Sequence, residues 1–191
     1  MYSQLIHRIK QYIQLSDSDI TVIETLFDKK TLVKGEFFLQ EGKICRELGF
    51  INKGLVCYYV TVNGTEVVHN FAKEHEFICN YDSFINKTVS HKNVIALEHT
   101  EMLCISFQKL QQLYKTISSG ERFGRLHMED VYTDAINHII SFYSSSPQQR
   151  YREFVQNRKE LLLRVPQYYI ASYLGIKPQS LSRIRKRMLK A

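Results

Sequence analysis

Two kinds of hydrophobic pattern alternate along this chain of 191 residues. In residues 3–27 the apolar side chains are spaced as on a helix, at Leu5, Ile6, Ile9, Ile13, Ile20, Ile23, Leu26 and Phe27. A polar run over 16–19 interrupts this spacing. We therefore expect two short helices, the second of which begins at a serine or aspartate cap.

The pattern changes to short runs rich in β-branched and aromatic residues between about 31 and 107. These runs are 31–33, 37–39, 48–52, 55–62, 65–71, 94–97 and 102–107. Asn63-Gly64 separates two of them, and this pair favours a type I′ hairpin because both central residues of that turn need positive φ. Strands at such spacing predict a small antiparallel barrel or sandwich.

Helical spacing returns from about 108 to 143. Met128, Tyr132, Ala135, Ile139 and Phe142 follow one face of an amphipathic helix of about five turns. Phe123 and Leu126 extend its apolar margin. Such a helix either packs on the barrel or pairs with a copy of itself, and the pattern leaves both alternatives open.

A second domain is predicted to begin at Ser146, which with Pro147 and Gln149 fits a capping box. Further on, the spacing indicates a helix-turn-helix. Ala171 is small enough for two helices to cross closely, and Gly175 supplies a left-handed turn residue. The apolar positions are Ile170, Leu174 and Ile176, and then Leu181, Ile184 and Met188 on one face of the second helix.

Charge is distributed unevenly between the two parts. Residues 1–144 hold 15 basic and 17 acidic side chains, whereas 145–191 hold 11 basic and only 2 acidic ones. A near-neutral body with a basic tail domain is typical of nucleic-acid binding. The residues we expect to contact DNA are Gln167, Tyr168, Gln179, Ser180, Ser182, Arg183, Lys186 and Arg187.

Other classes of function find little support. No apolar run is long enough to span a membrane and the N-terminus lacks a signal sequence, so we expect a soluble, cytoplasmic protein with no membrane partner. Cys45, Cys57, Cys79 and Cys104 are widely spaced, which argues against a disulfide framework or zinc site. Nucleophile–base pairs, metal motifs and phosphate-binding glycine loops are missing from the sequence, so we expect neither an enzyme nor a bound metal or other cofactor.

The segments "RVPQYYIASYLGIKPQSLSRIRKR" (164–187) and "LVKGEFFLQEGKICRELGFINKGLVCYY" (32–59) resemble the Crp/Fnr superfamily of bacterial transcription regulators, in the branch common in Bacteroidetes-type bacteria. The resemblance implies an α+β fold: an antiparallel, cyclic-nucleotide-binding-like β-roll (double-stranded β-helix) over 1–118, a long dimerisation helix over 119–144, and a helix-turn-helix domain over 145–191. Because the sequence stops soon after the second helix, we expect that domain to lack a full wing.

The resemblance also implies a homodimer that binds double-stranded promoter DNA and acts with RNA polymerase. The family's recognition arginine falls on Arg183, while Gln179 and Pro178 replace residues that often contact bases. The target sequence should therefore differ from that of the cyclic-AMP-binding members. The predicted dimerisation residues are Phe123, Leu126, Met128, Tyr132, Ala135 and Ile139.

The effector site departs from the family pattern. Where cyclic-nucleotide binders have Gly-Glu, this chain has Cys79-Asn80, and the position of their phosphate-binding arginine falls near Ser90-His91. There is no arginine between Arg46 and Arg122. Lys92 offers a point charge but no bidentate fork. We expect a pocket lined by Phe77, Cys79, Asn80 and Lys92 that does not take cyclic AMP, whether it takes another small molecule or none.

Cys79 can be interpreted as a redox sensor or as a small, buried, inert thiol, and we favour the second interpretation. The alternative to a DNA-binding regulator is a small-molecule or redox sensor whose basic helical domain docks on a protein partner. Binding to DNA that weakens as salt rises would distinguish the two.

Overall fold

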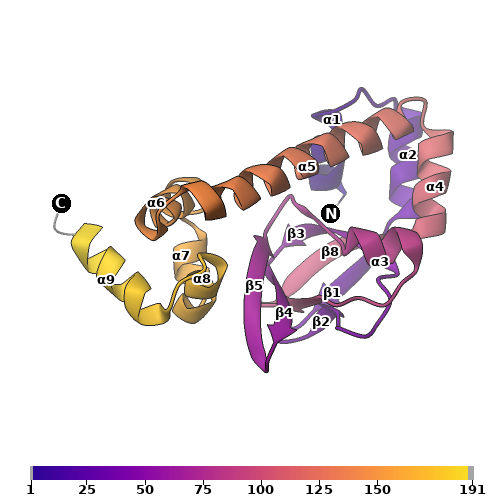
Figure 1. Cartoon of the computed structure of the whole chain (residues 1–191). Helices are drawn as coiled ribbons and strands as arrows, with labels where there is room; N and C mark the ends of the chain where they lie inside the picture. The colour runs from indigo at the N-terminus through magenta and orange to yellow at the C-terminus, as the bar shows by residue number, and fades with distance from the viewer. Residues whose placement is uncertain (1, 189–191) are drawn as a thin grey trace. The chain divides into compact units, whose positions relative to one another are not determined.

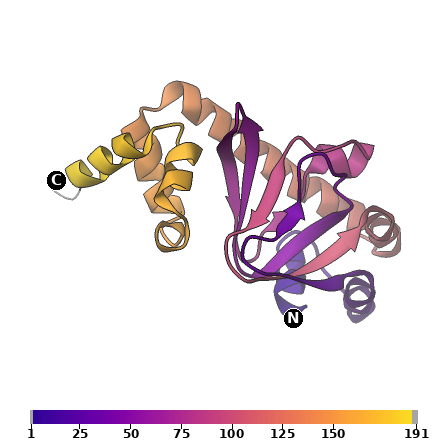
Figure 2. The ribbon, with the colours of Figure 1, turned by 90° about the horizontal axis from the view of Figure 1, so that it is seen from below.

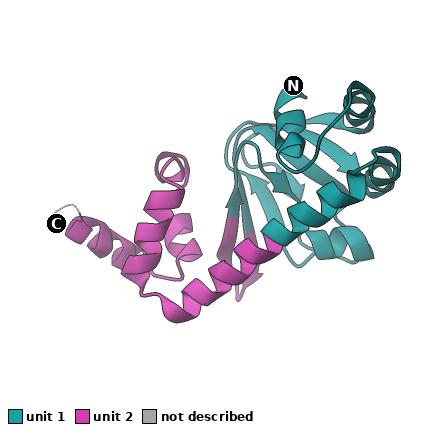
Figure 3. Ribbon diagram, turned by 90° about the horizontal axis from the view of Figure 1, so that it is seen from above, with its two compact units in different colours: residues 1–58, 71–130 teal, residues 59–70, 131–191 magenta. Residues whose placement is uncertain are grey.

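A computed structural model describes residues 2–188 of the chain. It divides into two compact units, one formed by 1–58 with 71–130 and the other by 59–70 with 131–191 (Figure 3). Among the residues described, no helix is long and apolar enough to cross a membrane. The three-part division at 118 and 144 remains a prediction.

The strands form two four-stranded sheets (Figure 1). One has the order β1 (Asp28–Leu32), β8 (Thr100–Ser106), β3 (Glu47–Lys53), β6 (Phe77–Ile78), and its pairs are antiparallel. The other has the order β2 (Phe37–Leu39), β7 (Asn93–Ala96), β4 (Val56–Val62), β5 (Thr65–Ala72). The predicted small antiparallel β-structure is therefore confirmed.

The turn between β4 and β5 follows its local sequence. Asn63 and Gly64 have φ values of 49° and 75°, the positive values that a type I′ turn requires. Two strands thus meet at the predicted hairpin.

Apolar faces of the strands and of several helices fill the core of the first unit. Phe50, Phe71 and Phe84 are among its largest fully buried side chains. The covering helices are α1 (Ser3–Lys10), α2 (Asp17–Leu26), α3 (Tyr81–Asn86) and α4 (Phe107–Thr116). Ser16 caps α2 in a capping box with Asp19, which confirms the predicted interruption between α1 and α2.

The long helix α5 runs from Gly120 to Ser144, 25 residues in all. It belongs to the first unit up to residue 130 and to the second from 131 onward. After it come α6 (Pro147–Asn157), α7 (Leu161–Arg164), α8 (Gln167–Tyr173) and α9 (Pro178–Met188). Ser146 and Gln149 form the predicted capping box at the start of α6.

The sequence pattern missed three short elements. The two-residue strand β6 has no alternation to detect, and α3 and α7 span only 6 and 4 residues. Elements of this length are held mainly by tertiary packing, because a single helical turn is unfavourable on its own. The helical region predicted after 107 is also divided, since α4 ends before α5 begins.

Candidate nucleic-acid interface

The turn between α8 and α9 has the geometry that the helix-turn-helix pattern predicts (Figure 2). Gly175 has a φ of 67°, in the left-handed region. The N–H of Ile176 donates to the carbonyl of Ala171 at 3.0 Å, and the N–H of Gly175 donates to the carbonyl of Ser172 at 2.9 Å. This pair of bonds is a Schellman motif, which ends α8 and turns the chain into α9.

Close packing also leaves no room for a side chain at Gly175. A Cβ atom at this position would lie 2.8 Å from Cε1 of Phe142. Phe142 in turn lies under the guanidinium of Arg150, whose Cζ is 5.0 Å from the ring centroid. Any larger residue at 175 would therefore have a strained backbone conformation, and its side chain would clash with Phe142.

Helix α9 has one buried face and one exposed face. Leu181 is buried, while Ile184 and Met188 are partly buried on the same side. Six residues of α9 are predicted to reach DNA. Ser180 is partly buried, and the other five are exposed: Gln179, Ser182, Arg183, Lys186 and Arg187. Among residues 2–188, none of these five exposed side chains has a hydrogen-bond or ion-pair partner. Their hydrogen-bond donors and positive charges therefore face solvent and are not paired with acceptors or acidic groups of the described residues.

The two residues predicted from α8 behave differently from each other. Gln167 accepts a hydrogen bond from Nη1 of Arg185 at 2.6 Å through its Oε1, so it connects the start of α8 to α9. Tyr168 is exposed, and its ring is tilted against that of Tyr169, with 4.3 Å between ring centroids. Tyr168 thus lies at the surface, whereas Gln167 helps to hold the two helices together.

Some of the positive charge of this unit serves its own structure. Arg150 donates from Nε and Nη2 to the carbonyl of Leu174, at 3.1 and 3.0 Å, and from Nη1 to the carbonyl of Ser145 at 2.6 Å. A guanidinium at the C-terminal end of α8 also interacts favourably with the helix dipole. The exposed charges of α9 are therefore the better candidates for an external partner.

The hairpin residues 59–70, which belong to the second unit, contact α8. The hydroxyl of Tyr169 donates to Oε2 of Glu66 at 2.7 Å, and Oγ of Ser172 accepts from the N–H of Val68 at 2.9 Å. Burial, followed by the bond to Glu66, raises the pKa of Tyr169. Sequence reasoning missed these contacts because they join residues more than 100 positions apart.

The predicted dimerisation residues fall into two groups along α5. Phe123 is buried in the first unit, where its ring centroid lies 5.8 Å from that of Tyr12. Leu126 and Met128 are partly buried. Tyr132, Ala135 and Ile139 are exposed, with Tyr132 at 68% and Ile139 at 51%. Phe123 therefore anchors the helix within its own chain, and an open apolar face begins beyond it.

Of the four predicted effector residues, Asn80 and Lys92 are linked through Ser90, whereas Phe77 and Cys79 have other neighbours. Asn80 is buried and donates through Nδ2 to Oγ of Ser90 at 2.7 Å, and Ser90 Oγ donates to the carbonyl of Lys92 at 2.8 Å. The bond between Asn80 and Ser90 joins the two positions that were aligned by sequence with, or near, the glutamate and arginine of cyclic-nucleotide binders. Lys92 itself is exposed.

Phe77 lies in an aromatic cluster. Its ring centroid is 5.0 Å from that of Phe50, 4.9 Å from that of His127 and 6.0 Å from that of Phe123. Burial, with a smaller contribution from the charge of Arg8, lowers the pKa of His127 to about 4. Phe77 therefore joins the sheet to the start of α5 through packed rings.

Cys79 lies next to Cys45, a neighbour that the sequence did not indicate. The two sulfur atoms are 3.8 Å apart, and all four cysteines are unbridged. Within residues 2–188, no group of three or more histidine, cysteine or acidic side chains is placed to hold a metal ion.

Comparison with known protein families finds a match for part of the chain. Residues 29–117 match the cyclic nucleotide-binding domain. Among curated proteins, no sequence matches this chain.

Solved structures resemble the chain from end to end. FixK2 from Bradyrhizobium japonicum is 13% identical with a TM-score of 0.75, over 86% of this chain and 85% of FixK2. A regulator assigned to the Crp/Fnr family from Eubacterium rectale is 15% identical with a TM-score of 0.71, over 94% and 88% of the two chains. A CooA mutant from Carboxydothermus hydrogenoformans is 15% identical with a TM-score of 0.72, over 96% and 83%.

Residues 29–117 thus resemble a cyclic nucleotide-binding domain, and the chain has the fold of these three solved structures, one of which is assigned to the Crp/Fnr family. The predicted β-roll, long helix and C-terminal helices are confirmed. The assignment to the Bacteroidetes-type branch remains a prediction.

Proposed function

We propose that this protein is a homodimeric transcription regulator that recognises promoter DNA through α9 and whose effector is not cyclic AMP. The observation that carries the proposal is the exposed face of α9, where Gln179, Arg183 and Lys186 lie opposite the buried Leu181. A helix that is buried on one side and cationic on the other suits the major groove of B-DNA. The fold shared with transcription regulators supports this role.

Different side chains of α9 serve different parts of the contact. Arg183 can donate two hydrogen bonds to O6 and N7 of guanine, and Gln179 can pair with adenine. Lys186 and Arg187 lie nearer the C-terminal end of α9 and suit phosphate oxygens, which position the protein without reading sequence. Tyr168, exposed at the start of α8, suits another phosphate, while Gln167 acts indirectly by holding Arg185.

The exposed face of α5 supports pairing with a second copy. Tyr132, Ala135 and Ile139 are separated by three and four residues, the spacing of a coiled-coil seam, and Met128 continues it toward the N-terminus. An exposed apolar stripe on a long helix is unfavourable in water unless a partner covers it. A two-fold pair of these helices gives two copies of α9, which matches near-palindromic DNA sites.

The effector residues argue against cyclic AMP. A buried cyclic phosphate needs a matched cation, and burial without one is costly. The family position for that cation lies near Ser90, whose hydroxyl is already bonded to Asn80 and to the backbone of Lys92. Calorimetry with cyclic AMP should therefore detect no binding at micromolar concentration, and clear micromolar binding would contradict this part of the proposal.

Fluorescence anisotropy with a labelled duplex, selected for binding from a random library, tests the DNA-binding role. Because each phosphate contact releases counterions, affinity should fall steeply with salt, by about 10³-fold or more between 50 and 200 mM for six or more contacts. Arg183→Ala should lower specific affinity by about 5- to 150-fold, corresponding to about 1–3 kcal/mol.

Arg122→Ala is the matched control, since it removes an exposed arginine from the first turn of α5. It should leave the affinity for the selected duplex unchanged. If both variants bind as the parent protein does, α9 does not read the DNA. If no duplex is bound at all, the basic domain serves instead to dock on a protein partner.

A further inference from the structure

The two cysteines at the edge of the first unit are held together by neighbouring strands. Cys45 comes two residues before β3, and Cys79 directly follows β6. These strands are paired antiparallel, with Gly49 opposite Ile78, so the start of one lies beside the end of the other. The pairing register, rather than any sequence motif, brings the thiols within 3.8 Å.

Hydrogen bonds fix the backbone at both cysteines. The N–H of Cys45 donates to Oγ of Ser83 at 2.9 Å, and the N–H of Cys79 donates to the hydroxyl of Tyr58 at 3.1 Å. Both thiols also face the carbonyl of Glu47, at 3.3 Å from Cys45 Sγ and 3.9 Å from Cys79 Sγ. The pair is therefore a defined arrangement and not a chance approach of two mobile side chains.

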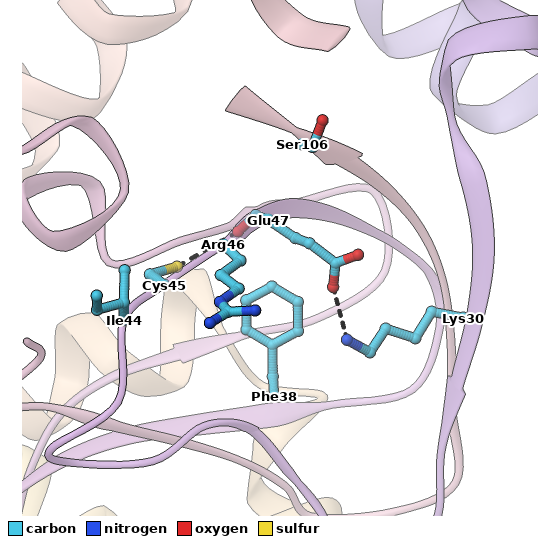
Figure 4. Close-up of a pocket in the computed structure, with 7 residues that line it drawn as sticks. All are labelled: Lys30, Phe38, Ile44, Cys45, Arg46, Glu47 and Ser106. Atoms are coloured by element: carbon cyan, nitrogen blue, oxygen red, sulfur yellow. Dashed lines mark hydrogen bonds and ion pairs between the residues drawn. The ribbon is translucent and has the colours of Figure 1, made fainter. Parts of the chain in front are cut away.

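Cys45 is buried, with 3% of its surface exposed, and Cys79 is partly buried, but Cys45 borders a pocket that opens to solvent. Cys45 lines an open pocket of about 450 Å³ together with Lys30, Phe38, Ile44, Arg46, Glu47 and Ser106 (Figure 4). Arg46, which also lines this pocket, is exposed. The hydrogen bond from the Cys79 thiol lowers the pKa of Cys45, although burial opposes this shift. A lower pKa increases the fraction of thiolate, which is the reactive form.

We propose that Cys45 and Cys79 form a redox-active dithiol that a peroxide converts to a disulfide. The Cys45 thiolate attacks one peroxide oxygen, so that an S–O bond forms, the O–O bond breaks and the second oxygen leaves as hydroxide or alkoxide, which takes up a proton. The product at Cys45 is a sulfenic acid. Cys79 then loses its proton and attacks the Cys45 sulfur, the S–O bond breaks and water leaves. Two thiols are oxidised by two electrons, and one peroxide is reduced to water and an alcohol or a second water.

Closing this disulfide would act directly on the segment that follows Cys79. The sulfur atoms must approach from 3.8 Å to about 2 Å. Cys79 immediately precedes Asn80, the residue at the start of α3 that donates to Ser90. Oxidation should therefore shift the start of α3, the segment where cyclic-nucleotide binders hold their ligand. Any consequence for DNA affinity rests on the function proposed above, whereas disulfide formation does not.

The test is stoichiometric oxidation of the full-length chain by hydrogen peroxide, followed by intact mass, thiol counting and peptide mapping. The count of free thiols should fall from four to two, with the loss of two hydrogen atoms and a cross-link between the peptides of Cys45 and Cys79. Cys79→Ser should stop at a sulfenic acid on Cys45, which dimedone traps, because a serine hydroxyl can still donate a hydrogen bond to Cys45 but cannot form a disulfide. Cys45→Ala should react far more slowly, because the sulfur that lines the pocket is gone.

Cys57→Ala is the matched control, since it removes a buried cysteine that is not a member of the pair. It should oxidise as the parent does. The proposal is overturned if no disulfide forms, if the cross-link joins other cysteines, or if Cys79→Ser forms no sulfenic acid while remaining folded by circular dichroism. Anisotropy of the oxidised and reduced forms separates the two proposals: absence of DNA binding in both forms contradicts the regulator function and leaves the dithiol chemistry intact.

Discussion

In the first unit the polar side chains at the expected effector site bond to one another, whereas in the second unit those of α9 face solvent. Asn80 donates to Ser90, and Ser90 donates to a backbone carbonyl. Gln179 and Arg183, by contrast, have no partner among the described residues. Polar groups that bond to each other have little hydrogen-bonding capacity left for a charged ligand. Exposed donors without a partner remain available to bind such a ligand.

The same contrast extends to apolar side chains of the two units. Phe123, at the start of α5, packs against rings of its own chain, while Tyr132 and Ile139 further along the helix are exposed. The part of α5 in the first unit therefore contributes to an internal core. The part in the second unit carries the face that we assign to a second copy of the chain.

The largest expected effect concerns the packing beneath α9. Leu181→Ala should destabilise the protein by about 2–5 kcal/mol, because Leu181 is buried and its truncation leaves a cavity. Hydrogen exchange should show the loss in α6 to α9 and not in the sheets. Leu163→Ala, at a side chain that is 96% exposed in the same unit, should change stability by less than about 0.5 kcal/mol. Equal losses in the two variants would contradict the assignment of Leu181 to the buried face.

A second prediction concerns the ring cluster around His127 in the first unit. The unfolded chain takes up a proton as the pH falls below about 6.5, but the buried imidazole resists protonation until about pH 4. The free energy of unfolding should therefore decrease on acidification through this window, by up to about 1.4 kcal/mol per pH unit. His127→Phe should remove this contribution, as measured by urea unfolding at several pH values. The same slope in both proteins would show that His127 is not buried in its neutral form.

The smallest expected effects compare the capping boxes of the two units. Ser16→Ala removes the cap of α2 and Ser146→Ala that of α6, and each should cost about 1 kcal/mol. Hydrogen exchange should place the first loss in the first unit and the second in the second unit. If either variant weakens both units equally, the two do not behave as separate compact bodies.

Features set by neighbouring residues could be predicted from the sequence. Ser146 with Gln149, Asn63 with Gly64, and Gly175 each act within a few residues, and the structure has all three as expected. The buried side of α9 also follows from helical spacing alone. These are the rules that depend only on backbone geometry and local hydrogen bonds.

Features set by strand register or by distant packing could not be predicted. Cys45 and Cys79 are 34 residues apart, and they meet only because β3 and β6 pair in one particular register. The bond between Tyr169 and Glu66 spans 103 residues. The interpretation of Cys79 as a small, buried, inert thiol was made without its neighbour Cys45, which only the tertiary structure supplies. The DNA-contacting and dimerisation residues remain predictions that the proposed experiments test.

Selection of bound duplexes from a random DNA library by the full-length protein tests the central claim most directly. If α9 reads DNA in a two-fold dimer, the selected sequences should contain two inverted half-sites whose centres lie about 10 base pairs, or one helical turn, apart. Arg183→Ala should erase the preference at one base pair in each half-site. Recovery of an unrelated, non-repeating sequence, or of no enriched sequence, would contradict the account.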